Sequence, residues 1–280
     1  MNEKPRPTLA DTRQRASAEL ARLVEIMARL RGPGGCPWDR EQTFESLKPY
    51  LVEEAYEVLD AMDAGSAAEH REELGDLLLQ IVFQAEIARE AGDWDLADVV
   101  QGIADKLEYR HPHVFGGGER LHDAQEVEQN WARLKAKEKE RKKGGRVSAI
   151  AGVPSAAPAL LRAERITEKA SRIGFDWPDA VGVRAKLDEE LAELDRALAS
   201  GDARAVEHEL GDVLFTLANL ARHLRTPAED ALRSAIRRFE DRFHWMEARL
   251  HERGLPSGER AAPEELDALW EEAKAREGSR

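Results

Sequence analysis

Two groups of acidic residues in this chain have types and spacings that could bind a metal ion. Each group is a Glu-Glu-x-x-Glu triplet followed by a Glu-x-x-Asp pair, and every residue of the second group lies 136 positions after its counterpart in the first. The first group is Glu53, Glu54, Glu57, Glu73 and Asp76, and the second is Glu189, Glu190, Glu193, Glu209 and Asp212. The shared internal register indicates two related units in the chain.

The spacing within each group places carboxylates on common helix faces. Residues three or four apart on a helix lie on the same side, so Glu54 lies beside Glu57, and Glu73 lies beside Asp76. If the two helices pack antiparallel, the carboxylates converge, and their repulsion and desolvation are costly unless a cation neutralises them. Oxygen-only ligands suit Mg²⁺ or Mn²⁺. The pattern therefore predicts a metal cluster in at least one unit.

Amphipathic helices must position these carboxylates. Around the second triplet, apolar side chains repeat with helical periodicity and form one stripe, consisting of Leu187, Leu191, Leu194 and Leu198. Glu190 and Glu193 border the stripe, so we expect them beside the core. The second helix of each unit also contains a glycine, Gly75 or Gly211. A mid-helix glycine costs roughly 1 kcal/mol relative to alanine, so we expect another helix or a ligand to approach it closely.

Almost nothing in the sequence has the pattern of a β-strand. The predicted helical ranges are 12–30, 44–64, 67–91, 95–110, 125–142, 159–173, 180–200, 202–224, 227–253 and 263–276. The fold class is therefore predicted to be all-α, with an N-terminal helical domain at 1–143, a Gly- and Pro-containing linker at 144–158 and a C-terminal helical domain at 159–280. Each domain is expected to have a four-helix-bundle-like core completed by dimerisation.

Length and charge exclude several classes of protein. The 280 residues suffice for about two domains. A net charge of −13 argues against nucleic acid as a general partner and against anionic membranes. The single Cys36 cannot form an intramolecular disulfide, and no secretory h-region or apolar stretch of roughly 20 residues occurs. We expect a cytoplasmic protein without a membrane partner.

Several further motifs carry a resemblance to a known family. They are residues 35–39 (Gly-Cys-Pro-Trp-Asp), 42–43 (Gln-Thr), 50–54 (Tyr-Leu-x-Glu-Glu), 110–115 (Arg-His-Pro-His-Val-Phe), 130–131 (Asn-Trp), 174–177 (Gly-Phe-Asp-Trp) and 219–223 (Asn-Leu-Ala-Arg-His). Through them the chain resembles two-domain members of the MazG family of nucleoside triphosphate pyrophosphohydrolases, over nearly everything after residue 20. The resemblance implies Mg²⁺-dependent cleavage of a nucleoside triphosphate between its α and β phosphates, giving a monophosphate and pyrophosphate.

The resemblance also implies the site residues. The family's metal ligands correspond to Glu190, Glu193, Glu209 and Asp212 in the second unit, with Glu189 close by, and to Glu54, Glu57, Glu73 and Asp76 in the first. The C-terminal unit of two-domain relatives is commonly the active one. Because the first unit keeps every acidic residue, the sequence leaves two active sites open.

Nucleotide contacts in the family lie C-terminal to the acidic motif. Arg238, Arg242 and Trp270 occupy the matching positions, and Lys186 precedes the second triplet. A lysine that some relatives have shortly before Glu-x-x-Asp has no clear counterpart here, where Arg204 is the nearest cation. The sequence therefore offers no matching lysine for phosphate contacts from that side.

The chemistry suggests a role for each group. Our hypothesis is that the metal ligands hold one or more Mg²⁺ ions, which can lower the pKa of a bound water and neutralise charge on the leaving pyrophosphate. Glu189 or Glu193 accepts the proton of the water. Arg238 and Arg242 cradle the outer phosphates, because guanidinium groups donate bidentate hydrogen bonds to such oxygens. The family resemblance suggests broad base tolerance and a role in clearing unwanted nucleotides.

The sequence is also compatible with other functions. Within the same chemistry, the chain could act more narrowly on dUTP, dCTP or a phosphoribosyl nucleotide. It could also be a helical binding protein that senses nucleotides and hydrolyses little. A carboxylate-bridged di-iron centre needs Glu-x-x-His on two helices, and Glu108 with His111 and Glu119 with His122 match that spacing. No P-loop is present.

Overall fold

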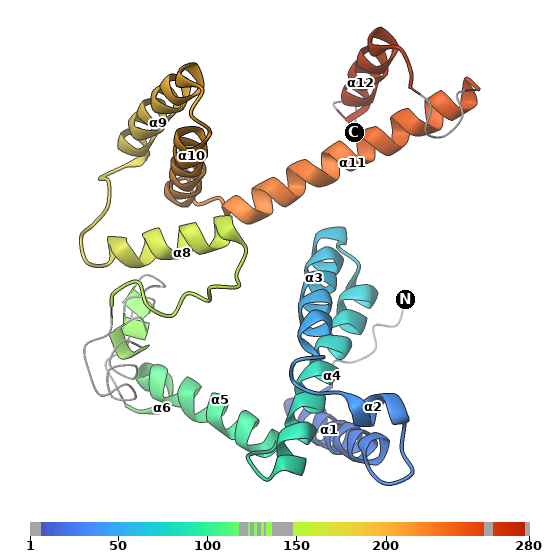
Figure 1. Cartoon of the computed structure of the whole chain (residues 1–280). Helices are drawn as coiled ribbons and strands as arrows, with labels where there is room; N and C mark the ends of the chain where they lie inside the picture. The colour runs from blue at the N-terminus through green and yellow to red at the C-terminus, as the bar shows by residue number, and fades with distance from the viewer. Residues whose placement is uncertain are drawn as a thin grey trace. The chain divides into compact units, whose positions relative to one another are not determined.

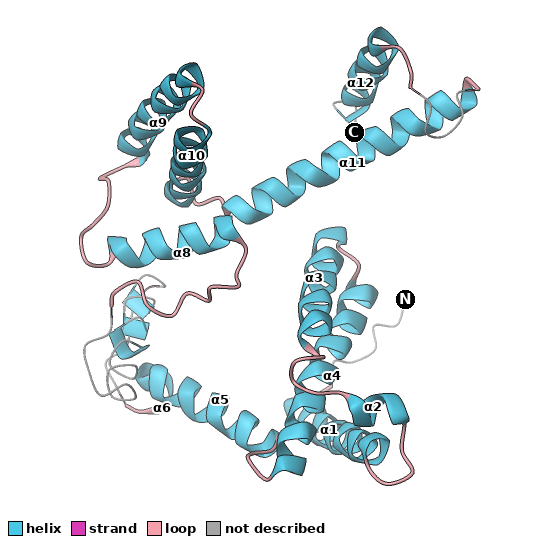
Figure 2. Ribbon diagram, viewed as in Figure 1, coloured by secondary structure: helices cyan, strands magenta, loops and turns pink. Residues whose placement is uncertain are grey.

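The computed structural model describes residues 7–117, 123, 126–127, 130–131, 133–135, 148–254 and 260–277, and every regular element among them is a helix (Figures 1 and 2). The predicted all-α class is confirmed for these residues. The chain divides into two compact units, Met1–Glu138 (unit 1) and Lys139–Arg280 (unit 2). The predicted domain bounds stay a prediction, and most of the predicted helix at 125–142 and residues 144–147 of the predicted linker lie outside the described residues.

Unit 1 is organised around a helical hairpin. Its helices are α1 (Leu9–Arg31), α2 (Pro37–Glu41), α3 (Lys48–Ala64), α4 (Ala67–Ala91), α5 (Leu96–Arg110) and α6 (Pro112–Phe115). The helices α3 and α4 pack against each other, and α1 packs on α4. A short turn joins α3 to α4, in which Gly65 ends α3 with a left-handed φ of 70° and Ser66 caps the first turn of α4. Met27, Leu47, Val82 and Phe83 form the buried core.

Unit 2 repeats the hairpin. Its helices are α8 (Ala159–Ser171), α9 (Ala180–Ser200), α10 (Ala203–His223), α11 (Ala228–Glu252) and α12 (Pro263–Glu277). Gly201 ends α9 with a φ of 74°, and the side chain of Asp202 accepts hydrogen bonds from the first backbone N–H groups of α10. These two residues lie 136 positions after Gly65 and Ser66. The turn that brings two acidic helices together is therefore duplicated along with the acidic residues.

Among the described helices of unit 2, α8 and α11 contact the hairpin, both through α10. The helix α8 lies against α10 through a cluster of small residues, Ala163, Ala218 and Ala228. The start of α11 belongs to that cluster, since Ala228 is its first residue. Farther along, α11 packs against α12, where Leu269 and Ala273 are buried. Small side chains allow α8 and α10 to approach closely, which fixes the base of the hairpin.

The structure differs from the sequence predictions at helix starts and in two loops. Short helices, α2 and α6, lie in segments expected to be loops, and each begins at a proline, the residue that suits a first helical position. The helix expected from residue 44 begins at Lys48, because Thr43 and Ser46 exchange side-chain hydrogen bonds in a turn before it. None of the described helices is long and apolar enough to cross a membrane.

The close approach expected at the two helix glycines is not observed among the described residues. A Cβ atom placed on Gly75 or Gly211 would meet no other atom within 4 Å. Both glycines lie at exposed positions of their helices, α4 and α10. The expected close approach by another helix was therefore wrong within the described chain. A glycine in a helix does not by itself indicate which side of that helix is covered.

Candidate active site

The helices α9 and α10 pack against each other as the hairpin of unit 2 (Figure 1). Their carboxylates come together. Carboxylate oxygens of Glu190, Glu193 and Glu209 lie within 4.8 Å of one another. A second group within the same limit consists of His208, Glu209 and Asp212. All four predicted metal ligands therefore fall in two overlapping groups that share Glu209. Hard oxygen donors at this spacing fit a divalent ion such as Mg²⁺ or Mn²⁺.

The predicted apolar stripe explains only part of this arrangement. Leu187 is 6% exposed and Glu190 is 7% exposed, so the first ligand does lie beside the core. Leu191 and Leu198 of the same stripe are 41% and 57% exposed. The hairpin thus buries one edge of the stripe and leaves the other edge uncovered within the described chain.

Lys186 lies over the start of the acidic group. Its ammonium nitrogen is 2.7 Å from Glu189 Oε1 and 3.0 Å from Glu190 Oε1. The hydrogen bonds to Glu189 and then Glu190 raise the pKa of Lys186 well above its usual value. Glu189 itself is exposed and does not belong to either group of potential metal ligands. The structure therefore places Glu189 beside the cluster, paired with a cation.

His208 was not predicted from the sequence. Its Nδ1 atom is 3.1 Å from Asp212 Oδ2 and 3.5 Å from Glu209 Oε1. The i, i+4 spacing to Asp212 was the available signal. The position 136 residues earlier is Glu72, so the two units differ here.

The hairpin of unit 1 forms a similar cluster with a different electrostatic setting. Oxygens of Glu54, Glu73 and Asp76 lie within 4.8 Å of one another, and Glu57 is not part of that group. Burial, followed by the charges of Asp76 and Glu57, raises the pKa of Glu54. Burial, followed by the charges of Glu57 and Asp76, also raises the pKa of Glu73. The residue 136 positions before Lys186 is Tyr50, which brings no positive charge.

The predicted nucleotide-binding residues lie on another part of unit 2. The guanidinium of Arg242 stacks 5.4 Å from the ring centre of Trp270, and the ring of Phe239 lies 5.3 Å from that of Trp270. Arg238 is exposed on the same helix, α11. Among the described residues, α11 contacts α8, α10 and α12 but not α9, and α12 contacts only α11. The helices that carry Arg238, Arg242 and Trp270 therefore do not contact α9, which carries Glu190 and Glu193.

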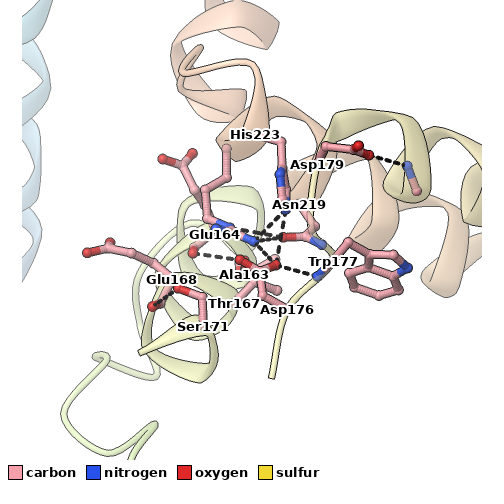
Figure 3. A network of polar contacts seen from close by, with 12 residues as sticks. Ala163, Glu164, Thr167, Glu168, Ser171, Asp176, Trp177, Asp179, Asn219 and His223 are labelled. Atoms are coloured by element: carbon pink, nitrogen blue, oxygen red, sulfur yellow. Dashed lines mark hydrogen bonds and ion pairs between the residues drawn. The ribbon is translucent and has the colours of Figure 1, made fainter. Parts of the chain in front are cut away.

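A polar network links the two chain segments at the open end of the α9–α10 hairpin, which is the end opposite its turn (Figure 3). Asp176, in the loop before α9, accepts hydrogen bonds from Arg222 and His223 at the end of α10. Arg222 also donates to the buried Asn219. Burial of Asp176 opposes its ionisation, but the hydrogen bonds from Arg222 and His223 outweigh it and hold its pKa below the usual value. The motifs at 174–177 and 219–223 therefore meet in one network.

An arginine also links the segments at the open end of the α3–α4 hairpin in unit 1. Arg31, at the end of α1, pairs with Glu90 at the end of α4 through Nη2 and Oε2, 2.7 Å apart. The same guanidinium donates to the backbone carbonyls of Asp39 and Gln42, in the segment before α3. An arginine thus joins the open end of each hairpin to the segment that enters it, although the arginine comes from a different helix.

The residues of the di-iron hypothesis do not form a centre in the described part of the chain. His111 Nδ1 lies 2.7 Å from the carbonyl oxygen of Leu107, and Glu108 belongs to none of the potential metal groups. Glu119 and His122 lie outside the described residues.

Comparison with known proteins identifies the repeated hairpin. The MazG nucleotide pyrophosphohydrolase domain matches residues 42–115 and 182–246, so each match includes one acidic hairpin. The nucleoside triphosphate pyrophosphohydrolase/pyrophosphatase MazG of Thermotoga maritima is 48% identical over 90% of this chain and 94% of its own length. The nucleoside triphosphate pyrophosphohydrolase of Escherichia coli K12 is 42% identical over 92% of this chain and 98% of its own. A solved structure of a mazG-related protein from Thermotoga maritima is similar at 31% sequence identity and a TM-score of 0.35, and the alignment covers 41% of this chain and 97% of that one.

Proposed function

This chain belongs to the MazG family and is a nucleoside triphosphate pyrophosphohydrolase, and we propose that it cleaves its substrates between the α and β phosphates with Mg²⁺ held in unit 2. The observation that carries the proposal is the meeting of Glu190, Glu193 and Glu209 across the α9–α10 hairpin. A triphosphate carries close to four negative charges, so this acidic site needs a divalent ion to accept it.

Four carboxylates of unit 2 hold the ion. Glu190 and Glu193 approach from α9, and Glu209 and Asp212 from α10, and all four offer the hard oxygen ligands that Mg²⁺ prefers. When bound, Mg²⁺ supplies an activated water and neutralises charge on the leaving pyrophosphate. Glu190 is buried, so it is the ligand most firmly fixed by packing.

Glu189 or Glu193, the first and last residues of the Glu-Glu-x-x-Glu triplet, accepts the proton of the attacking water. Glu193 lies within the cluster, and its carboxylate is 3.1 Å from Arg196 Nη2. Glu189 lies beside the cluster and is paired with Lys186. A triphosphate would draw Lys186 toward its own oxygens, which frees the Glu189 carboxylate to act as a base.

Recognition of the substrate rests on phosphates and on stacking. Arg238 and Arg242 donate to the outer phosphate oxygens, and Trp270 offers a ring on which a base can stack. Stacking on an aromatic ring tolerates any base, because every base has a π face. We therefore propose broad base tolerance, as the family resemblance implies.

A second copy of the chain completes the site in this proposal. Within the described part of one chain, α11 does not contact α9, and α12 contacts neither α9 nor α10. Large apolar side chains on the same hairpin are exposed, namely Leu191, Leu198, Leu210, Leu214, Phe215 and Leu217. A homodimer that covers these side chains would bury apolar surface and could bring α11 of one copy to the cluster of the other.

Product analysis tests the reaction. The purified chain is incubated with each common NTP and dNTP and Mg²⁺, with and without chelator, and the products are separated by ion-exchange chromatography. We expect metal-dependent formation of monophosphate and pyrophosphate from several bases. Diphosphate and phosphate would overturn the cleavage position, and turnover of one nucleotide alone would overturn broad tolerance.

A variant pair tests the site. Glu193→Gln is expected to lower kcat by about 10²- to 10⁴-fold, the usual contribution of a general base. Asp195→Asn, two residues away on the exposed side of α9, removes the same charge and is expected to leave kcat unchanged. Unchanged activity in Glu193→Gln, with folding verified by circular dichroism, would remove Glu193 from the mechanism.

A further inference from the structure

One histidine of unit 2 lies at the acidic cluster, and neither the repeated motif nor the family resemblance gives it a role. His208 of α10 has its Nδ1 atom 3.1 Å from Asp212 Oδ2 and 3.5 Å from Glu209 Oε1. The ligand atoms of these three side chains all lie within 4.8 Å of one another. Because residues three and four apart share a helix face, α10 alone assembles one nitrogen donor and two carboxylates.

The separations within this group are those of ligands around one ion. In an octahedral site with metal–ligand bonds of about 2.1 Å, neighbouring ligand atoms lie about 3 Å apart. The distances from His208 Nδ1 to the two carboxylates are close to that spacing. The imidazole is exposed, so an ion reaches Nδ1 from solvent without opening the hairpin. His208 therefore stands where a third ligand would join Glu209 and Asp212.

The equivalent carboxylates of unit 1 are grouped differently. There Asp76 is grouped with carboxylates of both hairpin helices, and a glutamate, Glu72, stands at the position of His208. In the described part of unit 2, Asp212 is grouped only within α10, with His208 and Glu209. The change from glutamate to histidine thus accompanies an aspartate that meets the histidine instead of the facing helix.

We propose that His208 is a metal ligand through Nδ1, and that with Glu209 and Asp212 it forms a second ion position of unit 2 that favours a first-row transition ion over Mg²⁺. Imidazole nitrogen suits ions such as Zn²⁺ and Fe²⁺, whereas Mg²⁺ prefers oxygen ligands. The tautomer with its proton on Nε2 leaves the lone pair of Nδ1 available to the ion. Glu209 also belongs to the oxygen-only group with Glu190 and Glu193, so its two oxygens can serve both ions.

This inference rests on the proposed function for Glu209 and Asp212 as metal ligands. To that function it adds a ligand residue and an ion preference. Neither depends on which phosphate bond is cleaved or on which nucleotide binds, so both can be measured without substrate.

Pulsed electron paramagnetic resonance of bound Mn²⁺ tests the contact directly. The full chain is loaded with Mn²⁺ until binding saturates, without nucleotide. We expect the spin echo to be modulated by ¹⁴N of a bound imidazole, and this modulation to change when the chain contains ¹⁵N-labelled histidine. His208→Gln should lose the modulation. His251→Gln, at the exposed end of α11, is the control and should keep it.

Competition between Co²⁺ and Mg²⁺ measures the ion preference. Glutamine offers an oxygen in place of Nδ1, so His208→Gln retains a ligand that Mg²⁺ accepts and loses the nitrogen. We expect the ratio of Co²⁺ affinity to Mg²⁺ affinity to fall about tenfold or more, because loss of even an outer-shell partner of a metal site commonly costs that much. Displacement of Mn²⁺ reports both affinities, and circular dichroism verifies the fold of this surface variant.

The outcomes separate this inference from the proposed reaction. Bound Mn²⁺ without a histidine ¹⁴N signal would mean that His208 only contacts the carboxylates, which overturns the inference and leaves the reaction standing. An unchanged ratio of Co²⁺ to Mg²⁺ affinity in His208→Gln would overturn the ion preference. A histidine signal in a chain that hydrolyses no nucleotide would uphold the ion position and overturn the reaction alone.

Discussion

Individual carboxylates add an electrostatic cost to the folding of each hairpin. Glu73 illustrates this cost, because burial and the charges of Glu57 and Asp76 raise its pKa above the ordinary value of 4.5. The folded chain therefore holds a carboxylate that would be ionised more readily in the unfolded chain. Raised carboxylate pKa values are common where acidic groups converge at binding sites, which supports the cation site predicted for unit 1.

Removing this charge is expected to stabilise the metal-free protein. Because the folded-state pKa of Glu73 is raised, its ionisation destabilises the fold above that pKa, and the penalty disappears as the pH falls through it toward 4.5. Glu73→Gln should therefore unfold at a higher temperature than wild type at pH 7 in chelator, and the difference should vanish once the pH is below 4.5. Glu41→Gln, an exposed charge change on α2, is the control. A lower unfolding temperature for Glu73→Gln at pH 7 would contradict the assignment.

The α9–α10 hairpin is fixed at both ends. Gly201 and Asp202 close one end, and Asp176 with Arg222 and His223 holds the other. The carboxylates proposed to bind metal lie between these two points. The network therefore controls how far the two acidic helices can spread.

Weakening the network is expected to lower stability in a pH-dependent way. The pKa of Asp176 is held below 3.8, so its contribution is complete above that value and is lost as the pH falls through the lowered pKa. Asp176→Asn is expected to lower the free energy of unfolding by about 1 kcal/mol at pH 7, a small value because the side chain is partly exposed. Urea unfolding should show this difference shrinking as the pH falls below 3.8. Asp179→Asn, which keeps a capping oxygen in the same loop, should change little.

Substitution of the helix glycines Gly75 and Gly211 tests how closely other groups approach the hairpin helices. A methyl group at Gly211 meets open space in the described chain, so Gly211→Ala is expected to raise the free energy of unfolding by about 0.5–1 kcal/mol. Gly75→Ala on α4 provides the parallel measurement. A decrease in either variant, measured by denaturant unfolding, would reveal that a group outside the described single chain approaches the glycine.

The sequence predicted the helical class and the grouping of carboxylates well, because both follow from periodicities of three and four residues. The helices at 67–91 and 180–200 begin and end where the structure has α4 and α9. The position of His208 beside Asp212 was missed, since it depends on which neighbour a side chain meets. The contact with another helix expected at Gly75 and Gly211 is absent from the described chain.

The proposed homodimer can be tested by mixing two inactive variants. If each site combines carboxylates of one copy with α11 of the other, Glu193→Gln and Arg242→Ala are each inactive alone. After mixing and exchange, about half of the dimers are mixed, and each has one intact site of two, so about a quarter of wild-type activity should return. No recovery, with exchange verified, would place the complete site within one chain.

Assembly itself can be measured with a surface variant. Leu214 on α10 is 48% exposed in the single chain. If it lies in the dimer interface, Leu214→Glu would place an unpaired charge there and lower the apparent mass by light scattering toward the 31.3 kDa of one chain. The exposed Glu207→Gln on the same helix is the control. A wild-type protein that is already monomeric would refute the dimer.

The short turns between the acidic helices have a consequence for how the protein folds. The predicted ligands on either side of the turn, Glu193 and Glu209, are separated by only 16 residues in the chain (209 − 193 = 16). Contacts between residues close in sequence form early and quickly, because little chain entropy is lost in closing a small loop. Each hairpin can therefore nucleate on its own turn, and its carboxylates meet before the rest of the unit has condensed around them. A divalent cation present during refolding should accelerate this step, whereas a chelator should slow it without changing the final fold.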